Sequence, residues 1–112
     1  MTEYLPQQIA AVESLLSRVP EFAETRARDT SFISHGRNDA PYLVFGDFGL
    51  FLLKRLTESP SHAQSEWWEL INEMLNSNDP HISNLIHVGV LEVLSDDPVA
   101  LAIAKRNLSA LA

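Results

Sequence analysis

Three polar side chains interrupt an otherwise apolar stretch between residues 80 and 95, where they could do chemistry. They are Asn84, His87 and Glu92. A carboxyl group is costly to bury unless it is paired, and burial raises its pKa so that it can act as an acid near neutral pH. We therefore treat the three residues as a candidate polar core cluster, which would bind a small ligand or serve as an enzyme site if the surrounding helices leave a cleft.

A structural interpretation of the same residues is favoured. His87 is expected to be a hydrogen-bonded interior histidine. Glu92 is expected to accept hydrogen bonds from backbone amides at a helix start or to pair with an arginine, the candidates being Arg18, Arg26 and Arg28. The three residues would then tie one helix to its neighbours, and the sequence predicts no catalytic residue.

An acidic stripe is the second feature that could have a chemical role. Three glutamates recur at helical spacing, and two aspartates lie at a later helix junction: Glu66, Glu69, Glu73, Asp96 and Asp97. Such a stripe is ordinarily a solvated helix face. The alternative is an acidic docking surface for a protein partner, with Trp68 at its margin as an aromatic anchor.

The sequence lacks the familiar motifs of catalysis and metal binding. The segment 45–49 contains Asp-Phe-Gly, the magnesium-binding triplet of protein kinases, but the other kinase motifs are missing, so the segment is interpreted as core packing. The four histidines are never three or four residues apart, as a helical metal pair requires. We therefore expect no metal site and no cofactor.

The charge of the chain is negative and unevenly distributed. Eight Lys and Arg against fifteen Asp and Glu give a net charge of −7, and no Lys or Arg occurs between Leu56 and Ala104. Such a surface repels phosphate backbones, which argues against nucleic-acid binding. It would attract a basic protein, or simply keep the protein soluble.

Proline and aspartate positions divide the chain into helices. We predict an all-α, compact bundle of five to six helices over these ranges: 6–19, 21–28, 41–57, 65–76, 80–95 and 98–108. The helix at 80–95 is apolar almost all round, so it should be central and covered by at least two others. Asp-Pro pairs at 79–80 and 97–98 predict that the last two helices form an antiparallel hairpin.

The predicted helix over 41–57 contains two glycines, Gly46 and Gly49. Each costs about 1 kcal/mol relative to alanine in a helix, and we expect the close approach of another helix to compensate. A helical wheel puts Tyr42 on the broad apolar face and Asp47 on the opposite face. The segment before this helix, residues 29–41, is predicted to be irregular, with a short strand at 30–34 as the alternative.

Length and composition predict a single domain spanning residues 1–112. The chain has no cysteine, no secretory signal at its amino terminus, and no apolar run close to the ~20 residues that span a bilayer. A cytoplasmic protein that makes no contact with a membrane is therefore expected.

Two segments resemble a group of small helical bacterial proteins of unknown function. One runs from Tyr42 to Leu52, and the other runs from Ile71 to Leu94 and includes Asn84 and Glu92. Some similar proteins look like immunity proteins, which neutralise a toxin delivered between competing bacteria. The resemblance implies a binding role and carries over no catalytic residue.

These observations favour a non-enzymatic, immunity-like protein that binds a basic protein partner through its acidic face. Two alternatives stay open. One is a small-ligand or enzyme site at the polar cluster of helix 80–95. The other is a structural homodimer that forms through Trp67, Trp68 or the Leu43–Leu50 face.

Overall fold

The computed structural model describes residues 5–29, 32, 34, 40–58 and 65–108. Within these ranges all regular structure is helical, with six helices and no strand, so the predicted all-α bundle is confirmed. The proposed strand at 30–34 lies largely outside the described residues, as does most of the irregular segment that precedes the third helix.

Proline opens most of the helices. Helix α1 spans Pro6–Arg18, α2 spans Pro20–Arg28, α3 spans Pro41–Glu58 and α4 spans Ser65–Leu75. Proline suits the first helical position because its missing N–H would have no partner inside the helix, and its fixed φ already matches the helix. The short, proline-marked junction between α1 and α2 turns the chain without a loop.

The chain from residue 80 to 94 forms one continuous helical body with a wide turn in the middle. Its parts are α5 (Pro80–Ile86), the π-helical turn η2 (His87–Leu91) and α6 (Glu92–Leu94). The Asp79 side chain caps α5 by accepting a hydrogen bond from the His81 amide at 2.9 Å. Helix α7 (Pro98–Asn107) begins with the same device, as the spacing of the two Asp-Pro pairs predicted.

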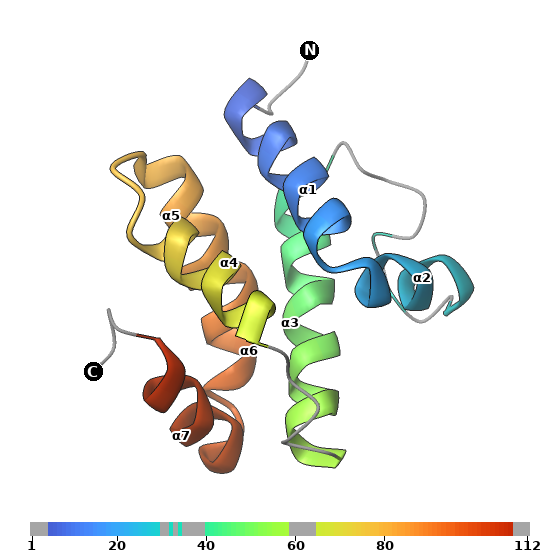
Figure 1. Cartoon of the computed structure of the whole chain (residues 1–112), viewed down its shortest axis with the longest axis vertical. Coiled ribbons are helices and arrows are strands. Elements are labelled where there is room, and N and C mark those ends of the chain that lie inside the picture. Colours follow the sequence, from blue (N-terminus) through green and yellow to red (C-terminus); the bar gives the residue numbers. More distant parts are fainter. Residues whose placement is uncertain (1–4, 30–31, 33, 35–39, 59–64, 109–112) are drawn as a thin grey trace.

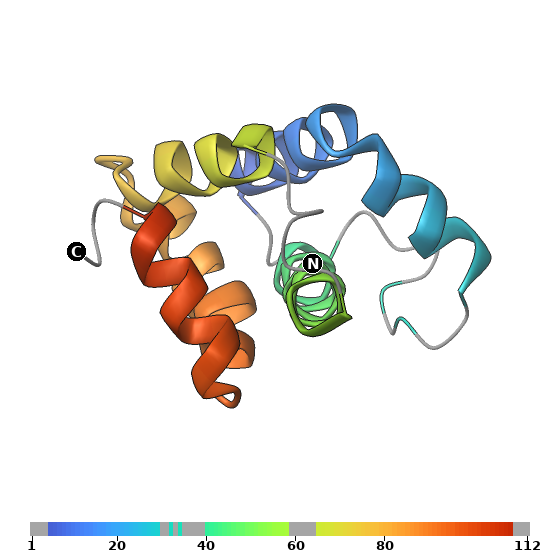
Figure 2. The same cartoon turned by 60° about the horizontal axis from the view of Figure 1, so that its bottom comes forward.

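The helices form two layers. Figure 2 shows α4, α1 and α2 following one another along one side, with α3, the 80–94 helix and α7 on the other. Figure 1 shows α4 and the 80–94 helix side by side, with α3 as a long upright helix between them and α2. Figure 2 shows α7 running back beside the 80–94 helix, as the predicted hairpin does, and α7 packs on α6. The Asn72 side chain of α4 donates a hydrogen bond to the Asn107 carbonyl at 2.9 Å, which holds the end of α7 against α4.

Aromatic rings fill the core where α2, α3 and α4 meet. The Phe22 ring lies 5.3 Å from Phe48 and 5.4 Å from Phe51, and the Phe51 ring lies 5.3 Å from Trp67. Tilted ring pairs at these centroid distances stabilise a core beyond the area that they bury. Helix α3 therefore carries a rigid aromatic cluster on the side that faces α2 and α4.

The other buried side of α3 meets the 80–94 helix through glycine. A Cβ on Gly49 would lie 2.5 Å from the Gly89 carbonyl oxygen, and a Cβ on Gly89 would lie 2.7 Å from Phe45 Cβ. No side chain fits at either position. The expected close approach is therefore confirmed for Gly49 but wrong for Gly46, where an added Cβ would meet nothing within 4 Å.

The burial of two residues of α3 does not follow from the helical wheel alone. Asp47 is buried, with 1% of its surface exposed, whereas Tyr42 is 39% exposed. Asp47 is buried because α3 is covered on the side of α2 as well as on the side of the 80–94 helix, and Ser34 supplies a hydrogen-bond partner for the buried carboxylate.

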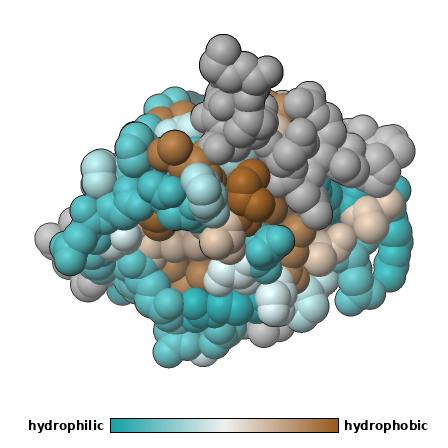
Figure 3. Space-filling view, turned by 90° about the horizontal axis from the view of Figure 1, so that it is seen from above, coloured by the Kyte–Doolittle hydropathy of each residue, from teal (hydrophilic) through white to brown (hydrophobic). Residues whose placement is uncertain are grey.

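Some hydrophobic side chains are exposed at the surface. Seen from the end at which α1 and α3 begin, hydrophobic side chains lie in the middle of the face and hydrophilic ones lie along its margins (Figure 3). Among the described residues, no helix is both long enough and apolar enough to cross a membrane.

Candidate functional site

The acidic stripe of α4 already holds one cation. The Arg18 guanidinium, from the end of α1, donates one hydrogen bond to Glu66 at 2.9 Å and two to Glu73 at 2.8 and 2.9 Å. The hydrogen bonds to Arg18 lower the pKa of Glu73, and those to Glu73 and then Glu66 raise the pKa of Arg18. Two of the three glutamates therefore join α1 to α4.

The remaining members of the acidic set have separate roles. Glu69 and Asp96 are exposed, whereas the Asp97 side chain accepts hydrogen bonds from the amides of Val99 and Ala100 and so caps α7. Trp68 is only 6% exposed and packs in the core. Its side chain therefore does not stand at the surface as the anchor of an acidic docking surface would.

The polar residues of the 80–94 helix lie on its outer face. Asn84, His87 and Glu92 are all exposed, and the Asn84 side chain donates a hydrogen bond to the Tyr42 hydroxyl at 2.9 Å. The structure therefore places them outside the core. The 80–94 helix packs against α3 and α4, so it is covered by at least two helices as predicted, and among the described residues these three side chains stay exposed.

The arginines considered as partners of Glu92 contact other residues. Arg18 binds the glutamates of α4, and Arg28 pairs with Glu24 one turn earlier in α2. Arg26 is buried and bonds to Ser34, as set out below. An exposed carboxylate at residue 92 needs no such partner, because water solvates it.

Apolar side chains are exposed near the same outer face. Leu50 and Val88 are 46% and 40% exposed, and Tyr42 stands beside Asn84. The other residues proposed for contacts between copies of the chain, Trp67 and Trp68, are buried. Of the proposed homodimer surfaces, only the one on α3 presents apolar area to solvent.

A buried polar relay connects α2 to α3. The Arg26 guanidinium donates to Ser34 Oγ at 3.0 Å and to the Ser34 carbonyl at 2.6 Å. The Ser34 amide donates to Asp47 Oδ2 at 2.7 Å, and the Ser34 hydroxyl donates to the same oxygen. Ser34 thus links a buried cation to a buried carboxylate.

Burial and charge act in opposite directions on this relay. All three residues are at most 6% exposed, and burial lowers the pKa of Arg26 while the negative charge of Asp47 raises it. Among the described residues, no buried side-chain nitrogen or oxygen lacks a hydrogen-bond partner. A satisfied network of this kind fixes one arrangement of its segments, because any other would leave a charge unpaired.

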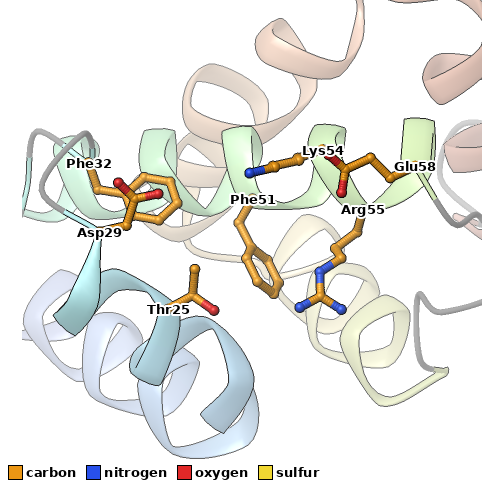
Figure 4. Close-up of a pocket in the computed structure, with 7 residues that line it drawn as sticks. All are labelled: Thr25, Asp29, Phe32, Phe51, Lys54, Arg55 and Glu58. Atoms are coloured by element: carbon orange, nitrogen blue, oxygen red, sulfur yellow. The ribbon is translucent and has the colours of Figure 1, made fainter.

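A hollow opens beside the relay, between α2 and the second half of α3. Its volume is about 240 Å³, and its lining combines aromatic, cationic and anionic side chains: Thr25, Asp29, Phe32, Phe51, Lys54, Arg55 and Glu58. We call it the α2–α3 pocket (Figure 4). It lies on the side of α3 opposite to the glycine contact with η2.

Sequence reasoning missed both the relay and the pocket. Asp47 was assigned to core packing as part of an Asp-Phe-Gly triplet, and Ser34 belonged to a segment predicted to be irregular. One signal was available: Asp47 is a charged residue among the three phenylalanines of residues 45–51, and Phe22 is a fourth aromatic residue of the core. A carboxylate in such apolar surroundings requires a buried hydrogen-bond donor. Nothing in the spacing identified that donor.

The described residues contain no group of three or more His, Asp or Glu side chains able to hold a metal ion. A protein-family profile described as "Domain of unknown function (DUF7674)" matches residues 12–111. The chain belongs to this family. No curated protein and no solved structure matches it.

Membership in the DUF7674 family confirms the expected kinship with proteins of unknown function. The family match gives no support to the immunity-type part of the resemblance. It begins inside α1 and extends past α7, so the Arg18 contacts, the buried relay and the α2–α3 pocket all fall within the matched residues.

Proposed function

We propose that the protein is a cytoplasmic, non-enzymatic binding protein that docks a basic protein partner on its α4–α7 half. The observation that carries the proposal is the charge of this half: residues 65–104 contain seven Asp and Glu and no Lys or Arg, and Lys105 and Arg106 near the end of α7 are its two cations. A surface of one sign raises the rate of encounter with a partner of the opposite sign.

The Arg18 contact supports the chemistry of this proposal. In this contact a guanidinium fits between two glutamates on one face of α4 and donates three hydrogen bonds to them. Exposed carboxylates beyond that contact, Glu69, Glu92 and Asp96, would meet the cationic side chains of the partner. Hydrogen bonds between charged groups are shorter and stronger than hydrogen bonds between neutral groups.

The test is an NMR titration of the labelled protein with an arginine-rich peptide, using an acidic peptide as the control. We expect saturable shifts of amides in 65–104, weakening steeply as salt rises from about 50 to about 500 mM. Glu69→Lys should weaken binding, whereas Glu13→Lys, the same charge change on exposed α1, should have little effect. Shifts confined to α1–α3, or binding indifferent to salt, would contradict the proposal.

A narrower form of the proposal makes the partner a bacterial toxin and the protein its immunity protein. The weak resemblance of the segments 42–52 and 71–94 motivates it. A secreted-toxin gene beside the gene for this chain would support it, and co-expression of the two should then restore growth of a toxin-sensitive strain. Growth arrest that persists at high levels of the folded protein would rule it out.

A homodimer is the second candidate, favoured by the exposed apolar side chains of α3 and η2. Tyr42 and Leu50 of α3 and Val88 of η2 are exposed, and a Cβ added to Gly46, between the first two in the sequence, would meet nothing within 4 Å. Sedimentation equilibrium should show a dimer that Leu50→Lys dissociates. Val99→Lys changes a residue that is 61% exposed on α7 and serves as the matched control. A monomer at high concentration would exclude this candidate.

A further inference from the structure

The walls of the α2–α3 pocket are fixed by contacts on their far sides. The Phe51 ring packs on Phe22 and Trp67, and the Phe32 ring lies 6.0 Å from Phe22 in an edge-to-face pair. The segment that carries Asp29 and Phe32 is pinned two residues later, where Ser34 enters the buried relay. A site built on such supported side chains loses little entropy when a ligand binds.

The lining of the pocket carries both signs of charge around an aromatic floor. Helix α3 contributes Lys54, Arg55 and Glu58, and Asp29 stands across the pocket at the end of α2. Figure 4 shows the Lys54 side chain extending above Phe51 toward Phe32 and Asp29. The pocket therefore presents a cation and a carboxylate beside an aromatic floor, a pattern that matches a ligand carrying both charges.

Arg55 has a different role from Lys54. Its guanidinium forms an ion pair with Glu21 and lies 5.2 Å from the centre of the Phe51 ring. These contacts orient the side chain and already balance its charge, and a cation over a ring face also stabilises that ring. Lys54 is therefore the cation that would meet an incoming carboxylate, while Arg55 closes one wall.

The size of the pocket limits the ligand to a small molecule. Its volume of about 240 Å³ corresponds to about eight waters at roughly 30 Å³ each, and it falls below the roughly 300–1,000 Å³ of sites that take drug-sized ligands. A single amino acid with an apolar side chain has this scale and carries one ammonium, one carboxylate and one apolar group.

We propose that the α2–α3 pocket binds a free α-amino acid with an apolar or aromatic side chain. Lys54 holds the carboxylate, Asp29 across the pocket accepts a hydrogen bond from the ammonium group, and the apolar side chain packs on the aromatic floor. This site lies away from the acidic α4–α7 half, so the inference is independent of the proposed partner-binding function.

The experiment is an NMR titration of the labelled protein with L-phenylalanine, L-leucine and L-methionine. Three matched probes each lack one recognised group: phenethylamine has no carboxylate, 3-phenylpropionate has no amine, and glycine has no side chain. We expect saturable shifts of amides in 22–29 and 51–58 with a dissociation constant at or below about 1 mM for at least one apolar amino acid. The three probes should bind at least about tenfold more weakly, since each loses a charged hydrogen bond or the apolar contact.

Variants separate the pocket from non-specific binding. Lys54→Met keeps the length and apolar stem of the side chain and should weaken amino-acid binding about tenfold or more. Lys105→Met removes an exposed lysine from α7 and should leave binding unchanged. The proposal is overturned if no apolar amino acid gives saturable shifts below about 10 mM, if the shifts map outside the pocket, or if both variants bind equally well.

Discussion

Helix α3 is held from two sides by opposite means. Toward α2 it presents a buried carboxylate, which reaches Arg26 through Ser34. Toward the 80–94 helix it presents Gly49, which lies against the Gly89 backbone with no room for a side chain. The first contact specifies its partner through charge and hydrogen-bond geometry, and the second specifies distance alone. The two sides should therefore respond differently to substitution.

The largest effect is expected on the polar side. Asp47→Ala leaves the buried Arg26 cation without its carboxylate and the Ser34 amide without its acceptor. Removal of one partner from a buried charged pair typically costs about 3–5 kcal/mol. The free energy of unfolding in urea should fall by this amount, provided that unfolding is two-state.

The control for this variant is a charged pair outside the core. Glu24→Ala removes the exposed partner of Arg28 one helical turn away, and it should change stability by less than about 0.5 kcal/mol. If the two substitutions lowered stability equally, the relay would not be a specific stabilising contact between α2 and α3.

The glycine side should show a smaller effect with a built-in control. Gly49→Ala places a Cβ 2.5 Å from a backbone oxygen, which can move only if η2 shifts, so a loss of about 1–3 kcal/mol is expected. Gly46→Ala meets nothing within 4 Å and should instead stabilise the protein by up to about 1 kcal/mol through helix propensity. Thermal unfolding of the two variants reports both signs, and a stable Gly49→Ala would show that the helices do not approach so closely.

The smallest effect is expected at the surface contact of Arg18. Its partner side chains are 46% and 62% exposed, so Arg18→Ala should cost no more than about 1 kcal/mol. Because Arg18 lowers the pKa of Glu73 in the folded state, this stabilisation is complete at neutral pH and disappears as the pH falls through that lowered value. Carboxyl ¹³C titration should show the pKa of Glu73 returning to its ordinary range in the variant, and no change would contradict the ion pair.

The helices and their order could be predicted because their determinants are local. Proline at a first helical position and Asp79 or Asp97 before it act within three residues, and the structure has both caps. The apolar face of the 80–94 helix was also predictable, since Leu85, Val90 and Leu94 are fully buried. Periodicity reports which side of a helix is apolar, whatever covers that side.

The pairing of polar residues could not be predicted in the same way. Asp47 and Ser34 are thirteen residues apart, and Ser34 belongs to a stretch without helical periodicity, so nothing in the pattern indicates that they meet. Asn84, His87 and Glu92 were placed in the core because their neighbours are apolar, but coverage depends on the other helices, and the described part of the chain leaves all three exposed. The sequence reports composition along one helix and says little about which helix faces it.

The wide turn at η2 has a consequence for the length of the chain. The Glu92 amide donates to the carbonyl of His87, five residues earlier, so this turn holds one residue more than an α-helical turn. Deleting one residue within it would leave an unbroken α-helix, whereas a deletion elsewhere in the 80–94 helix would rotate everything that follows by about 100°. Members of the family that differ by a single residue in this helix should therefore carry the gap between positions 87 and 91, with the contacts on either side preserved.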